Sequence, residues 1–525
     1  MSSISLASSV SSLSPNNGWI IQKFGGTSVG KFCEKICDDI VKIYSKTNRV
    51  AVVCSARSSK TKSEGTTSRL LRAADLASLD GDYQSILEIV REDHLQNAKD
   101  LIKDSTLLEG LIKDTNFECD QVLKLLHASQ IIGEISPRTL DSIMSAGEKL
   151  SCLFMTALFN DHGLNATYID LSTIIAPGLD LSRSGFDEKF YNNLAKSLGD
   201  KIRDLKSQDT IPVFTGYFGI VPGGLLNGVG RGYTDLCAAL IAVGISADEL
   251  QVWKEVDGIF TADPRKVPNA RLLSSVTPEE AAELTYYGSE VIHPFTMEQV
   301  IKAKIPIRIK NVENPKGDGT IIYPDDVSRK GESTPPHPPQ SFQKIPSSIF
   351  QKKKAATAIT TKHDIIVLNV HSNKKVLSHG FLALIFQTLD KYKLVVDLIS
   401  TSEVYVSMAL QHTDDESSSR LLREAVQELK KLGSVDVTKN MAIVSLVGKQ
   451  MKQFIGVAST MFSTLAENNV NIEMISQGAN EINISAVIDE KDARKALQSI
   501  HTKLLEQSNA IPILNQKIES LKLDI

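Results

Sequence analysis

The last third of the chain repeats itself, and this repeat restricts the fold more than any other feature of the sequence. Residues 380–400 align without a gap on residues 456–476, so every matched position recurs 76 residues later. The matches include the opening glycines, Leu389 with Leu465, and an Ile-Ser pair at the end of each segment. Chance similarity between two small α+β segments is the alternative, but a constant offset with these matches favours two copies of one small domain.

Each copy reads strand, glycine turn, helix, strand, strand, helix, which is typical of a ferredoxin-like βαββαβ unit. We expect the first copy at residues 359–440 and the second at residues 441–525. A proline-rich connector over residues 325–358 precedes them, with four prolines from Pro335 to Pro339. Because proline fits neither a helix interior nor a strand ladder, this connector should separate independent domains.

Before the connector, over residues 18–324, runs that are apolar on both faces alternate with helical ones. They predict an α/β fold, a mainly parallel sheet sandwiched by helices, in which ligands bind beyond the carboxyl ends of the strands. One helix should pass through Val29, Phe32, Ile36 and Ile40, and another should cover Asp235–Val243. The predicted strands are Trp19–Phe24, Val50–Cys54, Ile211–Phe214, Leu250–Val256 and Ile305–Lys310.

Composition narrows the class of ligand. The 525 residues carry 58 Lys and Arg against 62 Asp and Glu, a net charge of −4, which argues against a polybasic nucleic-acid binder. No run approaches the ~18 consecutive apolar residues of a membrane span. The serine-rich residues 1–17 lack the charges of a targeting signal, so we expect a disordered tail on a cytoplasmic protein that binds small molecules. Six cysteines without a Cys-x-x-Cys pair predict reduced, mostly buried thiols, at positions Cys33, Cys37, Cys54, Cys119, Cys152 and Cys237.

A first glycine-rich turn joins a predicted strand to a predicted helix over residues 23–28, Lys-Phe-Gly-Gly-Thr-Ser. Adjacent glycines let the backbone approach a ligand closely, Ser28 could cap the helix, and free N–H groups at a helix start attract anions. Lys23 adds a point charge at the edge. The segment fits a phosphate site, and local sequence leaves a plain strand-to-helix turn open as the alternative.

A second cluster, from Thr215 to Asp235, holds more glycines than packing requires. We expect its backbone to wrap around a ligand. Arg231 suits bidentate recognition of a carboxylate, whereas Asp235 is either functional or only a favourable charge at a helix start.

Three further segments carry charges whose role local sequence leaves open. Lys254 and Arg265 flank an Asp-Gly turn and serve either as surface charges or as cations for a polyphosphate. Glu148 interrupts an apolar helical stretch and could form a structural bridge or receive a ligand ammonium. Residues 277–280, Thr-Pro-Glu-Glu, form a helix capping box to which we assign no chemistry.

Four motifs, in this order, resemble those of the aspartokinases, members of the amino-acid kinase family. The match covers about residues 18 to 323, and the duplicated tail resembles the paired ACT regulatory domains of the same enzymes. The resemblance implies an amino-acid kinase fold followed by two ACT domains. The motifs are residues 23–28, Ser145-Ala146-Gly147-Glu148, Gly230 to Asp235, and Val256-Asp257-Gly258 with Asp263-Pro264-Arg265.

The resemblance implies phosphorylation of the β-carboxylate of L-aspartate by ATP with Mg²⁺, the first step towards homoserine, threonine and methionine. Lys23 would stabilise the transferring phosphoryl group as a catalytic residue, and Asp235 would orient Lys23. Mg²⁺ would be held mainly through the nucleotide phosphates. The matched ATP and phosphate positions are Lys23, Gly25, Gly26, Ser28, Lys254, Glu255, Phe260 and Arg265, and the matched aspartate positions are Thr67, Glu148 and Arg231.

The chain departs from the family pattern at two positions. Phe260 stands where a tyrosine is frequent, so any hydroxyl contact is lost. Glu290 stands where some bacterial members have a nucleotide-contacting lysine, and that contact is not carried over.

Paired ACT domains usually bind an amino acid at their mutual interface. The sequence is most similar to fungal members, for which threonine is the expected feedback effector and lysine a rival. The resemblance also implies a homo-oligomer formed through the ACT domains, without nucleic-acid or membrane partners. The matched effector positions are Ser378, His379, Gly380, Phe381, Leu382, Asp397, Asn471, Ile472 and Gln477, of which the apolar ones could equally pack in the core.

Two other functions compete with this hypothesis. Another amino-acid kinase, such as a glutamate kinase, is disfavoured by the ACT pair and by the amino-acid sequence of residues 23–28. A catalytically inactive amino-acid sensor is disfavoured because Lys23, Glu148, Arg231 and Asp235 are all present.

Overall fold

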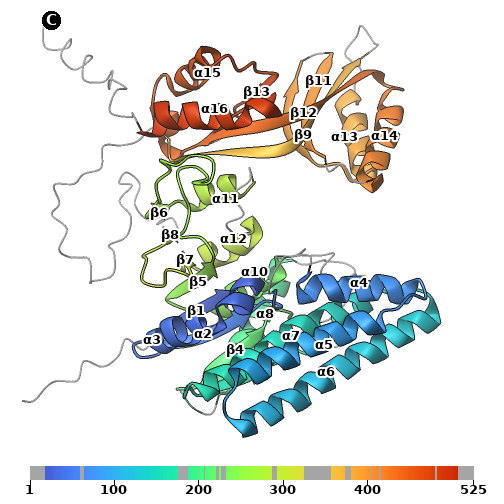
Figure 1. Ribbon diagram of the computed structural model, residues 1–525. Helices are drawn as coiled ribbons and strands as arrows, with labels where there is room; N and C mark the ends of the chain where they lie inside the picture. The colour runs from blue at the N-terminus through green and yellow to red at the C-terminus, as the bar shows by residue number, and fades with distance from the viewer. Residues whose placement is uncertain are drawn as a thin grey trace, which may run out of the picture. The chain divides into compact units, whose positions relative to one another are not determined.

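The computed structural model describes residues 18–58, 64–175, 187–205, 207, 209–219, 221, 224–225, 232–286, 292–323, 356–372, 380–402, 404–412, 416–478 and 482–506. The chain divides into two compact units (Figure 1). The first consists of Met1–Gly258 with Ile292–Gly331, and the second of Ile259–Val291 with Glu332–Ile525.

The first unit is built on a mainly parallel sheet, which confirms the predicted fold class. Its strands lie in the order β3-β4-β2-β1-β5-β7-β8, and neighbouring strands are parallel except for β7 and β8. The central strands β1, β2 and β5 are almost wholly buried, so their sequences are mostly apolar, and the polar residues Gln22, Lys23 and Gln251 are buried within them. The bounds are β1 Trp19–Phe24, β2 Arg49–Cys54, β3 Ala166–Ile169, β4 Ile211–Thr215, β5 Glu249–Lys254, β7 Ile307–Asn311 and β8 Thr320–Ile322.

Helices pack on this sheet, and α4 to α7 lie side by side (Figure 1). Asp104 caps α6 by accepting a hydrogen bond from the N–H of Leu107, and Gly133, with φ of 77°, ends it. Ser136 caps α7 in front of Pro137. The helices are α1 Gly26–Lys31, α2 Cys33–Lys35, η1 Ile36–Val41, α3 Lys42–Tyr44, α4 Thr66–Ser78, α5 Gln84–Leu101, α6 Ser105–Ile132, α7 Pro137–Asp161, α8 Glu188–Arg203, α10 Tyr233–Gly244 and α12 Pro294–Lys302.

The second unit contains one antiparallel sheet in the order β10-β11-β9-β12-β14-β13. Its strands are β9 Ala358–Ser372, β10 Val396–Thr401, β11 Tyr405–Gln411, β12 Gly433–Val447, β13 Met474–Ser476 and β14 Asn483–Asp489. Its helices are α13 Phe381–Lys391, α14 Glu416–Leu429, η4 Lys449–Gln453, α15 Val457–Glu467, η5 Glu490–Asp492, α16 Ala493–Ile500 and η6 His501–Glu506.

The backbone of this unit confirms the predicted duplication. Left-handed conformations recur at the same 76-residue offset, and each pair has nearly equal φ. The pairs are Gly380 with Gly456 (90° and 89°), Lys393 with Asn469 (57° and 53°), and Asp364 with Asn440 (57° and 58°). Asp364 and Asn440 lie within the long strands β9 and β12, where they separate the halves that belong to different copies.

The two copies share these long strands in an unexpected way. The second half of β9 pairs with β11 and with the first half of β12, which completes the first βαββαβ unit. The first half of β9, from Ala358 to Lys362, pairs instead with Ile443–Val447 of β12. The second copy therefore takes its last strand from a segment that precedes the first copy, so the copies are interlocked rather than consecutive.

The segment Ile259–Val291 belongs to the second unit, although it lies between β5 and β7 in sequence. The N–H of Ile359 donates to the carbonyl of Thr261 at 2.8 Å, and Ala262 and Val267 enter the apolar cluster of the second copy. The segment holds β6 Ser275–Val276 and α11 Pro278–Tyr286.

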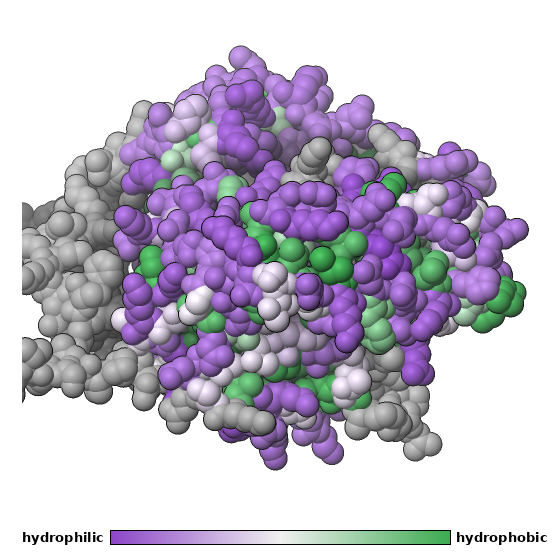
Figure 2. Space-filling model, turned by 60° about the horizontal axis from the view of Figure 1, so that its bottom comes forward, coloured by the Kyte–Doolittle hydropathy of each residue, from purple (hydrophilic) through white to green (hydrophobic). Residues whose placement is uncertain are grey.

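The expectation about cysteines is confirmed, because all six are buried and free of disulfides. Among the described helices, none combines the length and apolar character needed to cross a membrane. The face shown in Figure 2 is mostly hydrophilic, with apolar side chains gathered in small separate patches.

Candidate active site

Lys23 and Asp235 form an ion pair between a strand end and a helix start. Lys23 lies near the carboxyl end of β1, and Asp235 lies in the first turn of α10. Lys23 Nζ is 2.7 Å from Asp235 Oδ1, with the two side chains 11% and 16% exposed. A pair this buried holds its ammonium in one place far better than an exposed pair does. Asp235 is therefore more than a favourable charge at a helix start.

The glycine turn beside Lys23 is tightly packed on one side and open on the other. A Cβ on Gly26 would lie 2.2 Å from the carbonyl oxygen of Ala56, so a larger residue does not fit. A Cβ on Gly25 would meet no atom within 4 Å. The expectation that Ser28 caps the helix is wrong, because Ser28 lies inside α1. Its hydroxyl donates instead to Glu255 Oε1 at 2.7 Å.

The end of β5 supplies a second group of polar side chains. Lys254 ends the strand and Glu255 follows it. Asp257 Oδ1 accepts hydrogen bonds from the side-chain amides of Asn311 and Asn314, at 3.1 and 3.2 Å. These two bonds anchor the Asp-Gly turn, and sequence reasoning did not single out either asparagine.

Glu148 lies in α7 and is only 2% exposed. Its Oε1 accepts a hydrogen bond from the hydroxyl of Thr234 at 2.7 Å. Burial raises the pKa of Glu148 to about 7, and this rise is opposed by the Thr234 hydroxyl, the Tyr217 N–H, the Tyr233 hydroxyl and the Lys23 ammonium. A buried carboxylate surrounded by hydrogen-bond donors suits a cationic ligand group.

The structural ion pair considered as the alternative for Glu148 is formed by the next residue, Lys149. Lys149 Nζ is 3.0 Å from Asp170 and 3.7 Å from Glu118. Gly147, on the other side of Glu148, packs closely, because a Cβ there would lie 3.0 Å from the side chain of Ala56. The Ser-Ala-Gly-Glu motif thus combines one packing residue with one functional candidate.

Thr67 lies half-buried in the first turn of α4. Its neighbour Thr66 is buried, with Oγ1 3.2 Å from Nε2 of His94. Burial lowers the pKa of His94 to about 3, so its ring is neutral. Arg57, just after β2, bonds Asp93 Oδ2 at 2.7 Å. Sequence reasoning missed Arg57 and His94, because their partners lie far along the chain and only the fold brings them together.

Comparison with known proteins identifies the family. Residues 18–311 match the model of the Amino acid kinase family, and residues 444–504 match an ACT domain model. The aspartokinase of Candida albicans is 66% identical over 530 residues, which cover 99% of this chain and 97% of that protein. The chain belongs to the aspartokinases. The aspartokinase of Saccharomyces cerevisiae is 64% identical over 521 residues, which cover 97% of this chain and 98% of that protein.

The fold agrees with that of a solved aspartokinase. The crystal structure of Escherichia coli aspartokinase III in complex with aspartate and ADP has a TM-score of 0.70 and 25% identity. The alignment covers 93% of this chain and 99% of that one. Both the kinase fold and the ACT pair expected from the sequence are therefore confirmed.

Not every predicted residue of this aspartokinase joins the cluster around Lys23. Arg231 lies outside the described residues. Phe260 and Arg265 lie in the second unit, where Phe260 forms an isolated bridge with Leu272. The Arg265 side chain is 89% exposed, and its guanidinium is 2.9 Å from Asp263. Their contacts with a nucleotide remain predictions.

The predicted effector residues of this aspartokinase divide into three groups. Gly380 adopts φ of 90° at the start of α13, and Asp397 is buried in β10 beside Lys362. Phe381 and Ile472 pack against apolar clusters, as the core-packing alternative expects. The others are exposed, namely Leu382, Asn471 and Gln477, while Ser378 and His379 lie outside the described residues.

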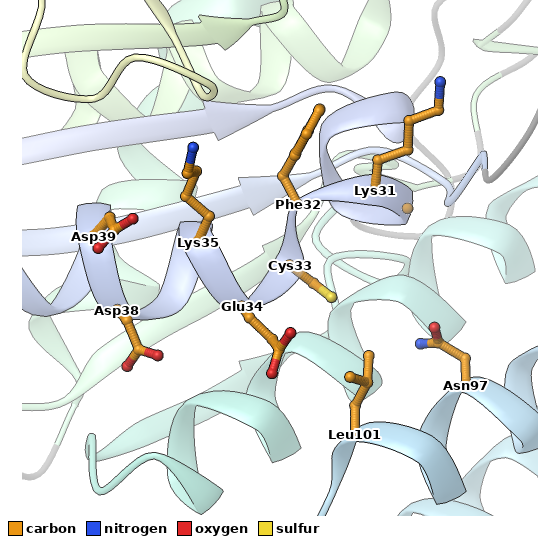
Figure 3. Close-up of a pocket in the computed structure, with 10 residues that line it drawn as sticks. Lys31, Phe32, Cys33, Glu34, Lys35, Asp38, Asp39, Asn97 and Leu101 are labelled. Carbon is orange, nitrogen blue, oxygen red and sulfur yellow. The ribbon is translucent and has the colours of Figure 1, made fainter.

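One cavity of about 550 Å³ lies between the α1–η1 segment and α5. Figure 3 shows Lys31 and Lys35 on one side of the segment and Glu34 on the other, facing α5. Asp38 lies beside His162, the C-cap of α7, with 3.0 Å between its Oδ1 and His162 Nδ1. No predicted site residue lines this cavity.

Nearby, Cys37, Asp38 and His162 bring possible ligand atoms within 4.8 Å of one another. Magnesium prefers oxygen ligands, so this mixed cluster does not fit the Mg²⁺ that the sequence resemblance implies.

Proposed function

We propose that this chain transfers the γ-phosphoryl group of ATP to the β-carboxylate of L-aspartate. The products are 4-phospho-L-aspartate and ADP, which makes this the first step towards homoserine, threonine and methionine. One observation carries the proposal, the buried carboxylate of Glu148 within electrostatic reach of the Lys23–Asp235 pair. Glu148 can accept the ammonium group of an amino acid, and Lys23 nearby can bind the phosphoryl group with which that amino acid reacts.

The reaction needs no general base. The aspartate β-carboxylate has an ordinary pKa of about 3.9 and is already ionised at neutral pH. One of its oxygens forms a bond to the γ-phosphorus, and the bond from this phosphorus to the oxygen that bridges it to the β-phosphate breaks. The electron pair leaves on ADP. The barrier arises mainly from bringing an anion to a polyanion, so fixed cations and alignment provide the catalysis.

Lys23 supplies the fixed cation. Its ammonium is held at 2.7 Å by Asp235, so little reorganisation is needed when negative charge gathers on the phosphoryl oxygens. Asp235 acts through Lys23 as a positioning residue. The open space above Gly25 leaves room for a phosphate oxygen to approach the backbone.

Glu148 binds the α-ammonium of aspartate through its buried carboxylate. Arg231 is proposed to bind the α-carboxylate through two parallel hydrogen bonds from its guanidinium group. Thr67 is proposed to contact the side-chain end of the substrate. With its ammonium and α-carboxylate fixed, aspartate presents only its β-carboxylate for reaction.

The nucleotide is proposed to contact Gly25, Gly26, Ser28, Lys254, Glu255, Phe260 and Arg265. Mg²⁺, held mainly through the nucleotide phosphates, would neutralise part of their negative charge. The carboxylates of Asp235 and Glu255 are engaged by Lys23 and Ser28, which fits an ion held mainly by the nucleotide rather than by a protein cage.

We further propose feedback by an amino acid at the ACT pair, with threonine as the effector and lysine as its rival. A homo-oligomer formed through the ACT domains and a cytoplasmic location complete the proposal. The conserved 76-residue symmetry of the second unit supports paired sensor modules.

A coupled assay of ADP release over a panel of carboxylate acceptors tests the reaction. We expect turnover with L-aspartate that is abolished in Lys23→Ala and unaffected in Lys46→Ala, an exposed lysine. Turnover with glutamate in place of aspartate would favour the other amino-acid kinases. Amino-acid binding without ADP release from any acceptor would favour the inactive sensor.

A further inference from the structure

Asp397 forms an ion pair with Lys362, whose ammonium group resembles the α-ammonium of a free amino acid. Its carboxylate is 3% exposed, and Oδ1 lies 2.7 Å from the ammonium of Lys362 in β9. Oδ2 is buried as well. A primary ammonium therefore already occupies one oxygen of the carboxylate predicted to bind an effector.

Tyr286, at the end of α11, completes this cluster. Its hydroxyl hydrogen-bonds the Asp397 carboxylate, and the Lys362 ammonium lies 5.1 Å from the centre of its ring. The tyrosine is 43% exposed, so solvent reaches the cluster from its side. Removing Lys362 from Asp397 would thus also remove a cation–π contact of Tyr286.

The helix that carries Tyr286 is anchored at its other end. Glu280 Oε1 accepts hydrogen bonds from the Thr357 hydroxyl at 2.6 Å and from the N–H of Lys449 at 2.9 Å. Glu283 also accepts a hydrogen bond from the Asn483 side chain. These bonds hold the first and middle turns of α11, and Tyr286 follows them at the end of the helix, in contact with Lys362.

The duplicated copy shows that this cluster is not a requirement of the fold. The residue 76 positions after Asp397 is Glu473, which is exposed, and the residue 76 positions after Lys362 is the uncharged Thr438. A pair needed to build the domain would be expected in both copies. The buried ion pair therefore forms only at the carboxylate of the first copy, with a lysine from the strand that the second copy borrows.

We propose that Lys362 is an internal competitor for the effector. Its ammonium occupies the place on Asp397 that the α-ammonium of a bound amino acid takes, and binding of that amino acid releases Lys362 together with Tyr286. This inference rests on the proposed amino-acid feedback. It adds the residue that the effector displaces and the residue on α11 that senses the displacement.

Effector binding to the full-length protein tests the competition, with thermal shift as a readout that needs no kinase activity. The probes are L-threonine, L-lysine and N-acetyl-L-threonine, which lacks the ammonium. In Lys362→Met the effector no longer competes, so we expect half-maximal stabilisation at a concentration about 5-fold or more below that of the native chain. N-acetyl-L-threonine should stabilise neither protein. Equal or weaker effector binding by Lys362→Met would overturn the inference.

Glu473→Gln is the matched control, because it removes the equivalent carboxylate of the second copy. Its response to the effector should equal that of the native chain, and a shift as large as that of Lys362→Met would refute a mechanism specific to the first copy. Should Lys362→Met fail to fold, Tyr286→Phe provides the test. It should keep the half-saturating effector concentration within about 2-fold while maximal inhibition of turnover falls by about half; unchanged inhibition would contradict the proposal.

Failure of the inference can be told apart from failure of the reaction. Aspartate-dependent turnover that no amino acid affects would refute the feedback and the inference that rests on it, but not the reaction. A protein that never releases ADP would refute the reaction, and tighter effector binding by Lys362→Met in thermal shift would still support the competition.

Discussion

The buried carboxylate of Glu148 makes the affinity for aspartate depend on pH. Burial raises its pKa from 4.5 to about 7, so below neutral pH the group carries a proton that must leave before it can bind an ammonium. We expect KM for aspartate to fall about tenfold for each pH unit gained up to about pH 7, and then to level off. The turnover number should change much less, because Glu148 touches the substrate but not the transferred group.

Replacing the carboxylate isolates its contribution. Glu148→Gln keeps the shape but removes the charge-assisted bond, which is worth about 1.5–3 kcal/mol, so KM should rise about 10- to 150-fold. This higher KM should no longer vary with pH between about 5.5 and 8.5. The assay is coupled ADP release over a series of aspartate concentrations, with Glu109→Gln, an exposed glutamate of α6, as the control.

The raised pKa of Glu148 also makes the stability of the ligand-free protein depend on pH. A raised pKa means that the native state holds the proton more tightly than the unfolded chain, so stability falls as pH rises from about 4.5 to about 7. The shift corresponds to a loss of about 3 kcal/mol of unfolding free energy over this pH range, and this pH-dependent loss should be absent in Glu148→Gln. A KM for aspartate that is flat with pH in the native chain, or equal in Glu148→Gln, would refute the reasoning.

Two further predictions concern the cation and the glycine turn. Asp235→Asn should lower the turnover number while changing KM for aspartate little, because it loosens Lys23 without removing it; an unchanged turnover number measured by the same assay would contradict the positioning role. Gly26→Ala should destabilise the protein by about 1–3 kcal/mol in denaturant unfolding, because its Cβ meets the Ala56 carbonyl, whereas Gly25→Ala should leave stability nearly unchanged. Equal stability of the two glycine variants would show that the close approach at Gly26 is not a constraint.

Local sequence was sufficient where a residue's environment follows from its neighbours. The strands β1, β2 and β5 are buried on both faces and so consist mostly of apolar residues. The capping box at Thr277 forms as expected, with reciprocal bonds to Glu280. Its glutamate has a second task that the motif does not reveal, because Thr357 and Lys449 reach it only in the folded unit.

Local sequence was insufficient where contacts join distant segments. The interlocking of β9 and β12 depends on pairing between residues some 85 positions apart, such as Ile359 with Leu446, and no periodicity records it. The capping role predicted for Ser28 was wrong for the same reason, because its hydrogen-bond partner Glu255 lies 227 positions further along the chain. Glu148 could be assigned only when the fold placed Thr234 and Lys23 around it.

The identity of the product tests the central claim most directly. Reaction of the native chain with ATP, Mg²⁺ and L-aspartate in the presence of hydroxylamine traps an acyl phosphate as a hydroxamate, which mass spectrometry of fragments assigns to one carboxyl group. The account predicts the β-hydroxamate of aspartate, in amounts equal to the ADP released. The α-hydroxamate, or ADP release without any hydroxamate, would contradict it.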